Sequence, residues 1–257
     1  MYGVVQSINT DASALVIVVG VGILFLMSDE VKVKVEQKEE RASGISSVLK
    51  DKLVWLIALN IFCVYSVYCG LTFFIPFLSK IYALPVALVG AYGIINQYCL
   101  KMVGGPIGGI IADKVLKSPS RYLCYSFMVS TLMLGLLIVL PHEQMSVYLG
   151  MACTLGFGTV VFTQRAVFFA PIGEAKIKED HIGSAMAMGS FIGYAPAMFC
   201  FSLYGHLLDQ YSGLLGYQIV FGIMACFAFA GTVISTLLVR EIKRKGAAPA
   251  TEQIAAS

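Results

Sequence analysis

Residues 104–117 of this chain read GGPIGGIIADKVLK, an apolar, glycine-rich run that ends in charge. Glycines let helices approach closely in lipid, where small residues dominate helix–helix interfaces. Asp113 follows where such a helix would reach the membrane surface, and a carboxylate there can cap the N-terminus of a nearby helix. Lys114 and Lys117 can meet lipid phosphate or an acidic partner. The run predicts a membrane helix with a charged end, and an ordinary charged loop after that helix is the alternative.

The composition of the whole chain points to the membrane as well. Of 257 residues, 58% are hydrophobic and only 13% are charged, with a mean hydropathy of +0.82. A soluble domain is nearer half apolar and a quarter charged. The excess apolar surface must therefore face lipid. A net charge of +3 gives no reason to expect a nucleic-acid partner.

The apolar residues fall into separate runs of the length that a bilayer requires, about 20 residues. Short turns rich in Pro, Gly, Ser and charge separate these runs, so neighbouring helices must be antiparallel. The fold class we predict is an all-α polytopic membrane helix bundle. One short candidate span covers 14–27, and six full ones lie at about 53–78, 85–111, 122–140, 146–171, 183–207 and 216–239.

The positive charges predict the orientation of these spans. Fifteen of the 18 Lys and Arg residues fall on one side of the membrane, Lys80 falls on the other, and Lys101 and Arg165 lie within spans. Positive residues accumulate on the cytoplasmic side of membrane proteins. We therefore expect a multi-pass protein of a plasma membrane, the bacterial inner membrane above all, with the N-terminus outside and the C-terminus in the cytoplasm.

An outside N-terminus and a short first span predict that the chain continues something longer. Residues 1–27 are interpreted as the final helix of a missing or truncated N-terminal bundle. The segment 28–52 balances six acids against six bases and is expected to be a cytoplasmic linker. Residues 53–240 form the expected six-helix bundle, and 241–257 the cytoplasmic tail.

The charged end of residues 104–117 resembles the signature of the major facilitator superfamily. That signature has a Gly, an Asp four residues later, a base at the next position and another base three further on. Gly109, Asp113, Lys114 and Lys117 fit this pattern, and we expect these four residues to act in gating or conformational change. Leu116 departs from it, because the family often has Gly just before the last base.

The resemblance implies two six-helix bundles around a central cavity whose access alternates between the two sides. This chain would supply one extra helix and the complete C-terminal bundle, with the preceding bundle as a partner. A second stretch resembles the fourth and fifth helices of such a bundle, from branches that include organic-anion and nitrate carriers. Its residues are Arg165, Pro171, Glu174, 183–189, 193–196 and 205–209.

Polar residues inside membrane spans are candidates for a functional site. Lys101 lies near the middle of its span, and no acid in that span neutralises it. Gln97 is four residues earlier and Asn96 adjoins it, so Gln97 would share a helical face with Lys101. We expect the three to line the cavity and Lys101 to attract an anionic solute. The alternative is a lysine that extends to the surface, about 15 Å away at 1.5 Å per residue.

Five further residues complete the candidate site. Arg165, close to a span end, is interpreted as a substrate contact or gate, although a bond to Glu174 is an alternative for it. Tyr68 and Asn60 are expected to line the cavity, Tyr68 together with Tyr65 on the same face. The remaining two candidates, for bending or gating, are Gly193 and Pro196, because proline interrupts the hydrogen-bond ladder of a helix.

Several classes of function receive no support from the sequence. There is no HExxH motif, Ser-Lys pair or intramembrane carboxylate pair, so we expect no catalytic residues and no enzyme. The seven cysteines lie singly in apolar runs, and we expect no disulfide, metal or cofactor. All 15 acids lie at span ends, loops or tails, which leaves symport, antiport and uniport open. The remaining alternatives are a seven-helix receptor-like protein and an inert half-transporter.

Overall fold

The computed structural model describes residues 48–142 and 145–255, and every regular element in these ranges is helical. The elements, where η2 is a 3₁₀-helix and η3 and η4 are π-helical turns, are α3 (Lys52–Gly70), η2 (Leu71–Phe73), α4 (Phe74–Ile81), α5 (Val86–Ile94), η3 (Ile95–Cys99), α6 (Leu100–Ile110), η4 (Ile111–Val115), α7 (Pro119–Val139), α8 (Val147–Val167), α9 (Pro171–Glu174), α10 (Glu179–Gly193), α11 (Pro196–Gln210) and α12 (Leu214–Ala255).

Consecutive elements join into helical runs that are long and apolar enough to cross a membrane. Within the described ranges there are six of them: Lys52–Ile81, Val86–Val115, Pro119–Val139, Val147–Val167, Glu179–Gln210 and Leu214–Lys245. The all-α fold class and the six full spans are thereby confirmed. The short span at 14–27 and most of the linker at 28–52 lie outside the described residues.

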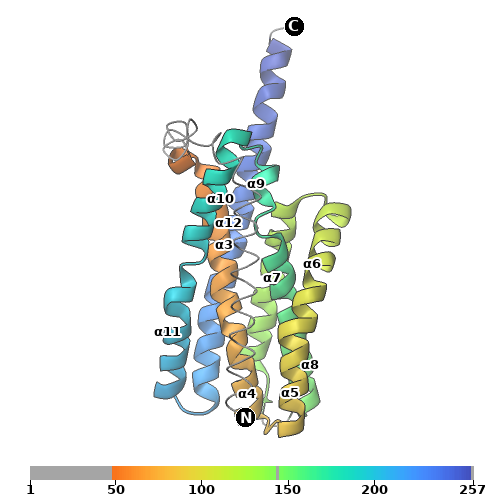
Figure 1. Cartoon of the computed structure of the whole chain (residues 1–257), viewed down its shortest axis with the longest axis vertical. Coiled ribbons are helices and arrows are strands. Elements are labelled where there is room, and N and C mark those ends of the chain that lie inside the picture. The colour runs from red at the N-terminus through yellow and green to blue at the C-terminus, as the bar shows by residue number, and fades with distance from the viewer. Residues whose placement is uncertain (1–47, 143–144, 256–257) are drawn as a thin grey trace, which may run out of the picture. The chain divides into compact units, whose positions relative to one another are not determined.

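The helix α3 is the central element of the bundle. It packs against α8, α10, α11 and α12, and Figure 1 shows it running beside α12. Of the most apolar window in Lys52–Ile81, 61% is buried, against 11% for Val86–Val115. A helix that is apolar on all faces belongs in the interior of a bundle, and α3 has apolar residues on every face.

Side-chain caps fix where the helices start. Asp51 accepts a hydrogen bond from the Leu53 N–H at 2.9 Å, which begins α3. Ser118 accepts from the Arg121 N–H at 3.3 Å and is followed by proline, the favoured first residue of a helix. These caps place the first residues of α3 and α7 within a few residues of the predicted starts at 53 and 122.

Three boundaries differ from the predicted ones. The span predicted at 85–111 continues through the π-helical turn η4 to Val115. Asp113 and Lys114 therefore belong to the end of a helix and not to a loop. The span predicted at 183–207 is two helices, because Pro196 starts a new one after the turn at residues 194–195. The last helix passes residue 239 and continues to Ala255. The residues that directly follow 239, at 240–245, are mostly good helix formers.

An aromatic cluster closes one end of the bundle. It consists of Phe74, Phe77, Tyr82, His142 and Phe221, and we call it the Phe77 cluster. The Phe77 ring centroid lies 5.1–5.7 Å from those of Phe221, His142 and Tyr82. Both nitrogens of His142 are hydrogen-bonded, Nδ1 to the Tyr82 hydroxyl at 2.6 Å and Nε2 to the Leu137 carbonyl at 2.7 Å. The cluster is a packed core with its imidazole fully satisfied.

Two of the four glycines in residues 104–117 lie at a close contact between two helices. A Cβ on Gly104 would lie 3.0 Å from Phe162 Cβ, and one on Gly108 would lie 2.8 Å from the Thr163 carbonyl oxygen. Both contacts join α6 to α8. Gly105 and Gly109 instead have nothing within 4 Å of a Cβ. The glycine pairs therefore serve two different faces of α6.

Candidate functional site

Arg165 lies in the last turn of α8, with its guanidinium over aromatic rings of α3. Its Cζ atom is 4.0 Å from the centroid of the Tyr68 ring and 5.6 Å from that of Tyr65. These distances are within the range of a cation–π interaction. The residues Arg165, Tyr65, Tyr68 and Tyr194 are called the Arg165 cluster below.

Three separate parts of the bundle build this cluster. Tyr65 and Tyr68 are three residues apart and share one face of α3, where their ring centroids lie 5.4 Å apart. Tyr194 comes from the turn between α10 and α11, and its ring centroid is 4.9 Å from that of Tyr65. The cluster thus joins α3, α8 and the interrupted helix pair α10–α11.

The guanidinium of Arg165 is left with an unpaired donor. Its Nη1 atom is buried and has no hydrogen-bond partner among the described residues. Glu174 does not supply one, because it accepts from the Ser118 hydroxyl and from the Ser120 N–H. A buried donor without a partner costs about 1–3 kcal/mol, and more when it is charged. An anion that reached Nη1 would remove this cost and pair the charge.

Asn96, Gln97 and Lys101, the three polar candidates in Val86–Val115, differ in burial. Lys101 is exposed on α6 and has no hydrogen bond or ion pair within the described part of the chain. Gln97 is half-buried, whereas Asn96 is buried against Gly158 of α8. Both amide atoms of Asn96 lack a partner among the described residues. Asn96 and Gln97 lie within the π-helical turn η3, which changes the helical phase that a regular α-helix would give them relative to Lys101.

Asn60 faces another helix rather than an open space. Its Nδ2 donates to the Ser235 hydroxyl of α12, and both side chains are buried. This bond ties the central helix to α12. The structure therefore places the Asn60 amide nitrogen in a helix–helix contact, while its Oδ1 has no partner among the described residues. The predicted place of Asn60 in the cavity stays a prediction.

The residues of the signature lie at the surface of the described bundle. Asp113, Lys114 and Lys117 are exposed and Gly109 is half-buried. Lys117 has φ of 49°, a left-handed conformation that ends the helical run. Their predicted gating role stays a prediction.

Gly193 and Pro196, the two candidates for bending, lie on either side of an interruption between two helices. α10 ends at Gly193 and α11 begins at Pro196. Gly193 packs directly on Ile61 of α3, where a Cβ would clash with the Ile61 side chain. The interruption is thus held against the central helix, next to Tyr194 of the Arg165 cluster.

Tyr194 is the member of the cluster that sequence reasoning did not select as a site residue. The signal for it was its place two residues before Pro196, in the segment where the helix breaks. Tyr65 was named only as a neighbour of Tyr68. A single sequence shows that each lies near an irregular or polar position, but not that α3, α8 and α10–α11 bring them together.

The bundle defines a polytopic helical membrane protein, and its family follows from comparison. Residues 12–199 match the family model described as Major Facilitator Superfamily. The chain therefore belongs to the major facilitator superfamily, a family of membrane transporters. The resemblance inferred from the signature residues is confirmed.

Two relatives from Escherichia coli (strain K12) match most of the chain. Inner membrane protein YihN is 68% identical over 238 residues, which cover 91% of this chain and 56% of that protein. Inner membrane protein YqcE is 27% identical over 244 residues, which cover 93% of this chain and 57% of that protein. The chain thus spans little more than half the length of these relatives.

Proposed function

We propose that this chain forms the C-terminal bundle of a carrier that moves a small anionic solute across the bacterial inner membrane. The transport is secondary active or facilitative, by alternating access. The observation that carries the proposal is the Arg165 guanidinium, buried at Nη1 without a partner among the described residues. A fixed cation inside a membrane bundle is a favourable place for an anion, because pairing replaces an unmet charge in a medium of low dielectric.

A second bundle is the expected partner of this one. The windows in Val86–Val115 and Glu179–Gln210 are the least covered of the six, with 11% and 22% of their residues buried. The first of them also carries Gly105 and Gly109, which face open space, and the exposed Lys101. Small residues and an unpaired cation suit a face that packs on protein around a cavity better than one that faces lipid. Lys101 is then a second contact for the anion.

The location of the Arg165 cluster supports alternating access. Tyr194 belongs to the interruption between α10 and α11, and it contacts Tyr65, which lies under Arg165. An anion bound at Arg165 would touch a cluster that includes this bend. Interrupted helices are where transporters place their binding sites and their moving parts. Gly193 and Pro196 are the proposed bending residues.

Uptake into proteoliposomes tests the proposal. The carrier is reconstituted as this chain together with its preceding bundle, and uptake is measured for sugar phosphates, carboxylates and nitrate, with uncharged sugars for comparison. Arg165→Ala is expected to lower kcat/KM for the transported anion roughly 100-fold, the effect of losing a charged hydrogen bond of about 3 kcal/mol. Lys178→Ala, which removes an exposed cation away from the cluster, is the matched control.

Arg165→Lys separates charge from geometry. It keeps the charge but loses the planar fork of donors, so partial activity is expected. Uptake of uncharged sugars in preference to every anion, or full anion uptake by Arg165→Ala, would overturn the proposal. An absence of uptake until the preceding bundle is added supports the two-bundle carrier.

A further inference from the structure

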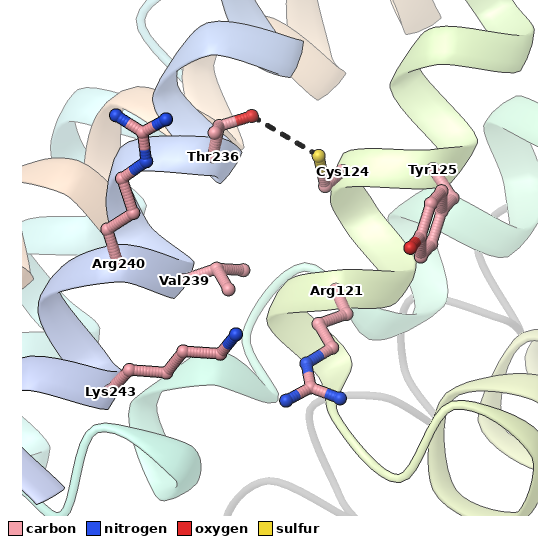
Figure 2. A pocket seen from close by; sticks show the side chains of 7 residues that line it. All are labelled: Arg121, Cys124, Tyr125, Thr236, Val239, Arg240 and Lys243. Atoms are coloured by element: carbon pink, nitrogen blue, oxygen red, sulfur yellow. Dashed lines mark hydrogen bonds between the residues drawn. The ribbon is translucent and has the colours of Figure 1, made fainter.

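A pocket outside the Arg165 cluster lies between α7 and α12. Its volume is about 420 Å³, and its lining includes Arg121, Arg240, Lys243, Cys124 and Thr236. This volume is within the range of small-molecule sites, about 300–1,000 Å³. Figure 2 shows Lys243 extending from α12 toward Arg121 on α7, with the Cys124–Thr236 contact of 3.4 Å at the other end of the pocket.

The three basic residues of the pocket have no acidic partner among the described residues. Two other cations beside α12 do have acidic partners: Lys52 pairs with Glu241 at 2.6 Å and Lys245 with Asp51 at 3.8 Å. Both of these pairs join α12 to the α3 side of the bundle. The α7 side of α12 thus carries an unbalanced positive charge, and an anion is what complements it.

An exposed apolar stripe on the same two helices continues from the pocket. On α7 it comprises Tyr125, Met128 and Leu132, and on α12 it comprises Phe229 and Val233, all exposed. Tyr125, Met128 and Leu132 follow Arg121 in successive steps of four, three and four residues, and Val233 and Phe229 precede Arg240 by seven and eleven residues. This helical spacing keeps them on the faces that line the pocket. A ligand held here would have its charged part at the helix ends and apolar parts along the stripe.

We propose that this pocket binds the phosphate headgroup of an anionic membrane phospholipid, with its acyl chains along the stripe. Basic pockets between membrane helices suit anionic headgroups. A soluble phosphate would match the three cations equally, but it would leave the stripe without a role. The proposal needs neither transport nor the Arg165 cluster.

Native mass spectrometry of the purified full chain in detergent tests the proposal with dioleoylphosphatidylglycerol and dioleoylphosphatidylcholine. One phosphatidylglycerol is expected to bind, roughly tenfold or more tighter than phosphatidylcholine, because only the former is anionic. The variant with Arg121, Arg240 and Lys243 all changed to Gln is expected to bind it roughly 100-fold more weakly, about fivefold for each cation. Millimolar inorganic phosphate is expected not to displace the lipid.

A matched control removes the same charge elsewhere. Lys50, Lys176 and Lys178 are exposed lysines outside the pocket, and changing all three to Gln is expected to leave binding within about twofold, since charge alone acts weakly at a distance. The single change Lys243→Gln, expected to weaken binding about fivefold, guards against a folding defect in the triple variant.

Three results would overturn the lipid site. The first is equal binding of phosphatidylcholine, and the second is an equal loss of binding in the control variant, which would mean non-specific attraction. The third is displacement by inorganic phosphate, which would identify a soluble-anion site instead.

Discussion

The Phe77 cluster and the Arg165 cluster use similar aromatic residues in opposite ways. At Phe77 the rings pack on each other and on His142, whose two nitrogens are both hydrogen-bonded. At Arg165 the rings of Tyr65 and Tyr68 support a guanidinium whose Nη1 has no partner among the described residues. In the first arrangement the imidazole is fully hydrogen-bonded, and the hydroxyl of the neighbouring Tyr217 lacks a partner among the described residues. In the second the unpaired atom belongs to a charged group, for which we propose an anion. Whether an aromatic cluster in a membrane bundle is a candidate binding site therefore depends on which of its charged and polar atoms have no hydrogen-bond partner.

The largest effect on stability is expected at the closed cluster. Phe77→Ala removes a fully buried ring and should destabilise the bundle by about 3–5 kcal/mol. Thermal unfolding in detergent measures this. Anion binding per folded molecule should not change, and a loss of anion affinity in the folded fraction would mean that the two clusters are not separate.

A somewhat smaller loss is expected where α6 meets α8. Gly108→Val places a side chain against the Thr163 carbonyl, and overpacking of this kind costs about 1–3 kcal/mol. The control is Gly105→Ala, because Gly105 has open space around it. Unfolding midpoints of the two variants should therefore differ clearly, and similar midpoints would show that α6 does not approach α8 in this way.

At the open cluster the Tyr68 ring is expected to matter more than its hydroxyl. Tyr68→Leu should weaken anion binding roughly fivefold, because a cation–π contact of about 1 kcal/mol no longer holds the guanidinium. Tyr68→Phe keeps the ring and should remain within about twofold of the parent. Titration of the transported anion checks both variants. Equal losses in the two would assign the role to the hydroxyl.

The smallest effect is expected at a surface turn away from both clusters. Lys176 has φ of 48°, a conformation that glycine adopts without strain. Lys176→Gly should stabilise the bundle by about 0.5–1 kcal/mol and leave anion binding unchanged. The unfolding midpoint would fall rather than rise if the lysine side chain itself holds this turn.

The sequence predicted the spans because hydropathy is local. The runs at 53–78 and 122–140 lie within a few residues of the observed helices, and Pro196 marked the interruption of the fifth span. The π-helical turn η3 was not predicted. Because Asn96 and Gln97 lie within it, they do not keep the α-helical spacing to Lys101 that the sequence suggested. The local hydropathy pattern does not indicate where a helix contains the extra residue of a π-helical turn.

The candidate site was only partly predictable for the same reason. Arg165 and Tyr68 were identified singly, because a charge or a polar ring inside a span is visible in the sequence. Their pairing was not, since α3 and α8 are about a hundred residues apart along the chain. Asn60 shows the reverse case, because its polar side chain suggested a cavity but bonds to Ser235 on α12. Only packing distinguishes a helix–helix bond from an open binding group.

One measurement tests most directly whether Arg165 is kept for an anion. The unfolding midpoint is compared for the parent carrier and Arg165→Met, each with and without a saturating concentration of the transported anion. Without anion, Arg165→Met should be as stable as the parent or more so, because an apolar side chain of similar length removes an unpaired buried donor. With anion, the parent should gain stability through ligand binding and the variant should not. A variant that is much less stable without anion, yet still stabilised by it, would contradict the account and make Arg165 a structural residue.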